Sequence, residues 1–158
     1  MLVHLIEAYI DSDELVKAKT VIGTICLKIA DYAIFYYSGR VELGMCNFEA
    51  AIDHFRKAYN YGLSSQRVCM DIGDRISIAA ALLGTTLLKQ SKDNEAEAFS
   101  ILQTGLNHCE QPSIREMILV HMSAEYRKLK KWNPSIEALC QVCPSQANKA
   151  MAQTYLEQ

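Results

Sequence analysis

The sequence predicts an all-α protein made of helical hairpins that stack on one another. Half of the 158 residues are apolar, which is enough for a continuous core, and only three prolines and seven glycines interrupt the chain. Apolar residues recur three and four positions apart over long stretches, which is the spacing of one buried helix face. We expect a single domain over residues 1–158, with hairpins near 1–30, 31–62, 64–108 and 113–143 and a terminal helix over 145–158.

The first hairpin is expected to pair a helix over residues 2–10 with a helix over residues 13–29. Four side chains at helical spacing mark one face of its first helix, namely Leu2, Leu5, Ile6 and Tyr9. The polar run 11–13 predicts the turn between the two helices. Ala18 and Ile22 then supply a small and a large residue on the second helix.

The second hairpin carries the clearest pattern in the chain. Gly39 lies on its first helix, and Ala51 and Ala58 lie on its second, so that the two backbones can approach closely. Phe48 and Phe55 fill the remaining space between the helices. A hairpin of this kind cannot bury its apolar face alone, which means that neighbouring hairpins must stack on it.

These residues make the chain resemble the tetratricopeptide repeat family. In that family a small residue is followed about twelve residues later by an alanine, then by a large apolar residue and a second alanine. Gly39, Ala51, Phe55 and Ala58 occupy these positions here, whereas Glu42 departs from the pattern because an aromatic residue is commonest there. The resemblance implies a right-handed superhelix of about four hairpins that serves as a binding scaffold.

The third hairpin is expected to have Gly84 on its first helix. The second helix supplies the matching residues Ala98, Leu102 and Gly105. The polar run 91–94 between them predicts the turn.

The segment 62–75 is longer than the standard repeat requires. The central glycines of the second and third hairpins are 45 residues apart, whereas the standard repeat has roughly 34. Gly62 could end one helix, and Ser64 or Ser65 could begin the next. The run 71–84 resembles the longer repeats of the kinesin light chain type, which favours long helices over a disordered insert.

The fourth hairpin begins near Pro112, a residue suited to a helix start. Its expected packing positions are Leu119, Met122, Ser123 and Tyr126 on the first helix and Trp132, Ile136 and Leu139 on the second. Ser145 then predicts the N-cap of the terminal helix.

Composition argues against several kinds of partner. A net charge of −2 predicts no nucleic-acid partner, and the basic run 127–131 is typical of a solvated helix face. No apolar run approaches the roughly 20 residues needed to cross a bilayer, so we expect no membrane partner. Six cysteines in a sequence without the cationic leader of a signal peptide predict reduced thiols and a cytoplasmic or nuclear location.

Candidate chemical groups are sparse. Cys140 and Cys143 have metal-ligand spacing, but a structural zinc needs four ligands, so two more would have to come from elsewhere, with His108 and Cys109 as candidates. Two cysteines three positions apart are more simply one buried helix face. The histidines share no motif with a nucleophile, and no glycine-rich phosphate loop is present. We therefore expect no metal, no cofactor and no enzymatic activity.

The resemblance also implies which residues line the groove of the superhelix. They are Tyr36, Arg40 and Leu43 in the second hairpin, Ala81, Thr85 and Leu88 in the third, and Val120, Ala124 and Arg127 in the fourth. This lining is mostly apolar and has no asparagine, unlike the family members that grip a C-terminal carboxylate. We expect an internal, partly apolar segment of the partner, with an acidic residue that meets Arg40.

The sequence therefore predicts a non-catalytic scaffold or adaptor that binds a protein or peptide partner in its groove. Two alternatives stay open at this point. One is a structural subunit of a larger helical-repeat assembly, which associates with itself or with further repeats through its end helices. The apolar helix over residues 2–10 supports that alternative. The other is an enzyme with an unrecognised helical site.

Overall fold

The computed structural model describes residues 2–26, 31–65 and 72–142. Over these residues the chain forms eight α-helices and one short 3₁₀ helix, with no strand, which confirms the predicted all-α class. The helices are α1 (Leu2–Asp11), α2 (Leu15–Cys26), α3 (Tyr32–Gly44), α4 (Phe48–Ser65), α5 (Ile72–Gln90), η1 (Lys92–Asn94), α6 (Glu95–His108), α7 (Pro112–Lys128) and α8 (Trp132–Cys140). The terminal helix expected over 145–158 lies outside the described residues.

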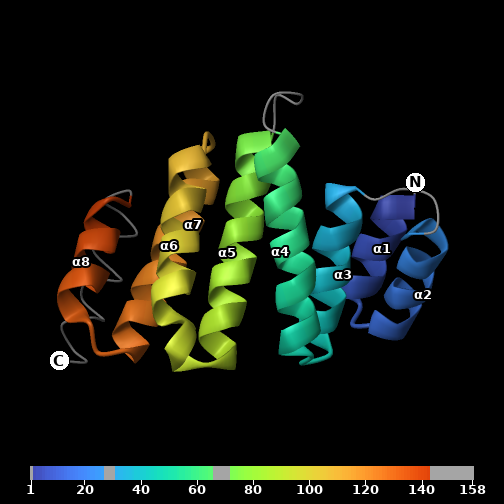
Figure 1. Ribbon diagram of the computed structural model, residues 1–158, viewed down its shortest axis with the longest axis horizontal. Helices are drawn as coiled ribbons and strands as arrows, with labels where there is room; N and C mark the ends of the chain where they lie inside the picture. The colour runs from blue at the N-terminus through green and yellow to red at the C-terminus, as the bar shows by residue number, and fades with distance from the viewer. Residues whose placement is uncertain (1, 27–30, 66–71, 143–158) are drawn as a thin grey trace.

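The helices pack in chain order. They follow one another along the long axis of the molecule, from α1 and α2 at one end to α8 at the other (Figure 1). Within pairs, α1 packs on α2, α3 on α4, α5 on α6 and α7 on α8. Between pairs, α2 contacts α3, α4 contacts α5 and α6 contacts α7. The core is consequently a row of clusters, each of which joins neighbouring helix pairs.

Three of the turns between paired helices have the same backbone conformation. Asp13, Cys46 and Lys130 are the described non-glycine residues with positive φ, at 58°, 59° and 57°. In each turn the next N–H donates to the carbonyl five residues back, as Glu14 to Tyr9, Asn47 to Glu42 and Lys131 to Tyr126, each at 2.8 Å. This hydrogen bond closes a helix C-terminus in the Schellman geometry. These three turns therefore share one backbone conformation although their sequences differ.

The small residues of the second and third hairpins allow close helix crossings, as predicted. A Cβ atom on Gly39 would lie 2.5 Å from Cε1 of Phe55, and one on Gly84 would lie 2.7 Å from Cγ of Leu102. Ala51 is completely buried on the facing helix. The aromatic ring of Phe55 thus occupies the space that a side chain at position 39 would need.

In the fourth hairpin two serines make the corresponding contact between α7 and α8. The Oγ atoms of Ser123 and Ser135 are 2.8 Å apart, and both side chains are buried. Ser135 occupies the position of Ala51 in the second hairpin, and sequence reasoning did not single it out. A serine can replace alanine there because its hydroxyl has a partner.

The expectation that Gly62 ends a helix is wrong. Helix α4 continues through Gly62 to Ser65, and Ser64 and Ser65 belong to it instead of capping the next helix. Gly62 is buried because α5 passes close by, and a Cβ atom there would lie 2.8 Å from Cγ1 of Ile76. The glycine serves interhelical packing and does not act as a cap.

Candidate functional site

A groove opens between α3, α5 and α7, which are the first helices of three successive pairs. Its volume is about 320 Å³. Helix α3 contributes Tyr36 and Leu43, and α7 contributes Met117, His121 and Glu125. Helix α5 forms the middle with Ile78, Ala81, Leu82, Thr85 and Lys89. Residues from three parts of the chain therefore share one surface.

Four residues predicted for the groove lie together in it, namely Tyr36, Leu43, Ala81 and Thr85. Arg40 and Leu88 do not line it. Arg40 pairs with Asp11 of α1 at 3.5 Å and lies over the ring of Tyr36, 5.9 Å from its centroid. Leu88 packs against the buried cluster that contains Phe55.

The lining contributed by α7 differs from the predicted one. Val120, Ala124 and Arg127 were expected there, whereas the structure places Met117, His121 and Glu125 along the groove. Val120 instead packs against a buried cluster of α6, α7 and α8. The predicted and observed residues lie on different faces of α7. Which face lines the groove depends on how the fourth hairpin packs against the third.

The floor of the groove, its middle part formed by residues 78–85 of α5, is apolar apart from one hydroxyl that already has a partner. Thr85 donates its hydroxyl to the Ala81 carbonyl at 2.8 Å, so this group needs no hydrogen bond from a ligand. Leu43 and Leu82 pack against the core from this side. Met117 is 39% exposed and is one of the few large apolar side chains that the described surface leaves open. The middle of the groove can therefore accept an apolar side chain without burying an unpaired hydroxyl group.

Two charged residues of the groove differ in their surroundings. Glu125 accepts a hydrogen bond from Lys128 at 2.7 Å, and its side chain is only 14% exposed. Lys89, in the last turn of α5, is exposed and forms no ion pair with any residue of the described ranges. The groove therefore carries a positive charge that no described residue neutralises.

A smaller cavity of about 180 Å³, lined by both polar and apolar residues, lies between α2, α3 and α4. Glu42 accepts hydrogen bonds there from Lys19 at 2.7 Å and from Asn47 Nδ2 at 3.0 Å. The bond from Lys19 is the main reason why the pKa of Glu42 is lowered. The contact between Lys19 and Glu42 connects the first helix pair to the second.

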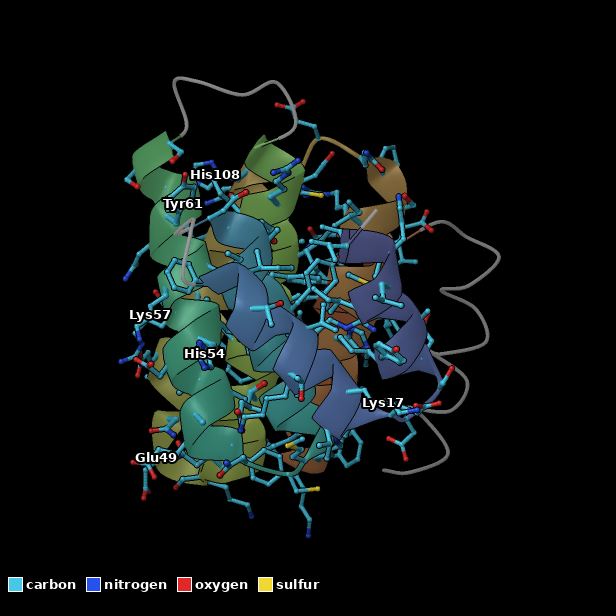
Figure 2. The ribbon with its side chains drawn as sticks, turned by 90° about the vertical axis from the view of Figure 1, so that its right-hand side faces the viewer. Lys17, Glu49, His54, Lys57, Tyr61 and His108 are labelled. Carbon is cyan, nitrogen blue, oxygen red and sulfur yellow. The ribbon has the colours of Figure 1, made fainter. Side chains whose placement is uncertain are left out.

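His54 lines the same cavity. It lies on α4, as do Glu49, Lys57 and Tyr61 (Figure 2). Burial is the main cause of the lowered pKa of His54, and its Nδ1 has no hydrogen-bond partner within the described part of the chain. Ser38 is nearby, but no hydrogen bond joins it to His54 in the described ranges, and Glu42 is bound to Lys19. The residues of this cavity are thus not arranged as a nucleophile, a base and a group that orients the base.

An apolar cavity of about 390 Å³ lies between α1, α2 and α3. Its walls include Leu2, Ile22 and Ile34, and Asp31 is its charged lining residue. Exposed large apolar side chains are also concentrated on this first helix pair, where Leu5 is 40% and Val16 is 73% exposed. This helix pair therefore exposes the kind of apolar surface that association through end helices would need.

The described residues contain no group of three or more His, Cys, Asp or Glu side chains placed to hold a metal ion. Cys46, Cys109 and Cys140 are free thiols, and Cys143 lies outside the described ranges. Within those ranges, every helix is too short or too polar to traverse a lipid bilayer.

Comparison with known proteins gives no assignment: no protein family matches the chain, and no curated protein or solved structure is significantly similar to it.

Proposed function

We propose that this chain is a non-catalytic scaffold of the tetratricopeptide-repeat type that binds a segment of a partner protein in the α3–α5–α7 groove. The observation that carries the proposal is the groove itself, because three helix pairs contribute to it and its floor is apolar. The packing of the helices in chain order is compatible with a right-handed superhelix, which we propose as the arrangement. The free thiols support a cytoplasmic or nuclear location.

The groove supplies binding energy mainly through apolar contact. A partner side chain that buries about 100 Å² of apolar surface on Leu43, Leu82 and Met117 gains roughly 2.5 kcal/mol. Tyr36 at the edge adds a large, rigid contact that loses little entropy on binding. Affinity in the micromolar range needs several such contacts, since about 8 kcal/mol is required.

Substitution of Met117 tests this proposal. Met117→Lys places a charge in the groove, and we expect partner proteins captured from cell extract to bind at least about tenfold more weakly, or 1.4 kcal/mol. The melting temperature should change little, because Met117 is 39% exposed. The control is Tyr61→Lys, which adds the same charge at a residue of similar exposure, 37%, that belongs neither to the groove lining nor to the first helix pair. If both variants capture as much partner protein as the native chain does, the groove is not the binding site.

A structural subunit that associates through its end helices is the second candidate. The exposed apolar side chains of the first helix pair favour it, above all Leu5 and Val16. Light scattering after size exclusion measures this association directly. If the native chain is oligomeric and Leu5→Lys makes it monomeric while Met117→Lys does not, the assembly role replaces the groove.

A further inference from the structure

We infer that the groove selects acidic segments: it takes an apolar side chain on its floor, and Lys89 at its edge pairs with an Asp or Glu side chain beside it. This inference rests on the proposed function and names the chemical class of the partner. It assigns the charge recognition to Lys89, a residue for which sequence reasoning predicted no role.

Within the described ranges Lys89, Lys92 and Lys130 form no ion pair with a carboxylate, and of these three only Lys89 lines the groove. Five other lysines each pair with a carboxylate, namely Lys17, Lys19, Lys57, Lys128 and Lys131. Lys89 is the groove's own cation, and the described chain offers it no such partner. Its three N–H donors are therefore available to a ligand.

Two other charged residues at or beside the groove, Arg40 and Glu125, are already paired. Arg40, which was expected to meet an acidic residue, is bound to Asp11. Glu125, the acidic residue of the lining, is bound to Lys128. A basic segment would consequently be repelled by Lys89 without finding a free carboxylate, whereas an acidic segment finds an unpaired cation.

The position of Lys89 next to an apolar floor increases the effect of this charge. A partner side chain that covers Ile78, Leu82 and Met117 displaces water from the groove, and a charge pair at its border is then less screened. The last turn of α5 also favours a cation, because the free carbonyl groups at a helix C-terminus carry partial negative charge. The C-terminal turn of α5 thus favours a positive charge at this position.

The experiment uses the full chain and a randomised library of peptides of about twelve residues with both ends blocked, so that only side chains can supply a carboxylate. Selected peptides should place Asp or Glu within a few positions of a large apolar residue. Changing that acidic residue to its amide should weaken binding at least about fivefold. Lys89→Glu should weaken the same peptides by about tenfold or more, and added salt should lower the affinity of the native chain.

Lys92→Glu is the matched control, because Lys92 is also exposed and lies in η1, outside the groove lining. It should change the affinity by less than about twofold. If peptides depend on Met117 but bind Lys89→Glu as tightly as the native chain, the charge selection is wrong and the groove remains the site. If Met117→Gln, which removes the apolar contact without adding a charge, binds every selected peptide as well as the native chain does, both proposals fail. Enrichment of basic peptides would also overturn the inference.

Discussion

Gly39 and Gly23 illustrate how one residue type can have two opposite effects within helices. A Cβ atom on Gly39 would lie 2.5 Å from the ring of Phe55, whereas one on Gly23 would meet nothing within 4 Å. Gly39 is required by a close helix crossing. Gly23 only adds flexibility to the unfolded chain and lowers the helix propensity of α2.

We therefore expect opposite signs from the same substitution at these two sites. Gly39→Ala should lower the free energy of unfolding by about 1–3 kcal/mol, because Phe55 must move in a packed core. Gly23→Ala should raise it by about 0.5–1 kcal/mol, because alanine is the better helix former. Urea unfolding followed by circular dichroism measures both changes. A neutral Gly39→Ala would mean that Phe55 has room to rotate.

At the scale of elements, Asp74 links one helix pair to the next. Its carboxylate accepts hydrogen bonds from the backbone N–H groups of Glu110 and Gln111, each at 3.1 Å. These residues form the connection between α6 and α7, while Asp74 lies in the first turn of α5. A side chain of the third hairpin therefore holds the start of the fourth in place.

Asp74→Ala should destabilise the protein by about 1–3 kcal/mol, because two backbone donors at a partly buried site lose their acceptor. Hydrogen exchange of the backbone amides of residues 110 and 111 should accelerate more than exchange of the amides within α7. Asp53→Ala is the control, since Asp53 is an exposed residue that pairs only with Lys57 on its own helix. If both variants lose the same stability, the connection does not depend on Asp74.

The contact between Glu42 and Lys19, which joins the first and second helix pairs, should make the unfolding free energy depend on pH. The pKa of Glu42 lies below the ordinary value of 4.5, chiefly because Lys19 donates a hydrogen bond to it. A carboxyl group with a lowered pKa stabilises the folded state above its ordinary pKa, and this contribution disappears as the pH falls through the lowered value. Glu42→Gln should therefore flatten the decrease in unfolding free energy between about pH 5 and pH 3.

The comparison for this pH effect is Glu49→Gln. Glu49 is exposed on α4 and forms no ion pair with the described residues. Its substitution should leave the slope of stability against pH close to that of the native chain. Identical slopes for both variants would show that the contact between Lys19 and Glu42 contributes no net stability.

At the scale of the whole molecule, contacts between neighbours in sequence should produce uneven stability. Helix α5 packs on α4, α6 and α7, whereas α1 buries a single described residue, Ile6. A row of helix pairs opens from its ends, because an end pair has a neighbour on one side only. We expect native-state hydrogen exchange to be slowest in α4 and α5 and faster in α1, α2 and α8.

A substitution in the first pair separates local opening from global unfolding. Ala18 is completely buried in α2, so Ala18→Glu should abolish protection in α1 and α2. Protection in α5 and α6 should persist if the helix pairs are coupled only to their neighbours. Loss of protection throughout the chain would show that all pairs unfold as one cooperative unit.

The helical class and the contacts within hairpins could be predicted from the sequence. The apolar period of a helix is local, and a small residue opposite a large one, as at Gly39 and Phe55, is visible within a short stretch of chain. The same reasoning failed at Gly62, because a buried glycine and a capping glycine look alike until the neighbouring helix is placed. It also missed Ser135, whose burial depends on a partner hydroxyl on another helix.

The groove depended on tertiary structure for more than half of its lining. Tyr36, Leu43, Ala81 and Thr85 could be named from repeat positions, because α3 and α5 keep the same relation to their own second helices. Met117, His121 and Glu125 could not, since the rotation of α7 toward the groove is set by side chains packed between the third and fourth hairpins. The absence of Arg40 from the groove lining has a related cause. Its partner Asp11 lies on α1, and only the packing of that helix against α3 brings the two charges together.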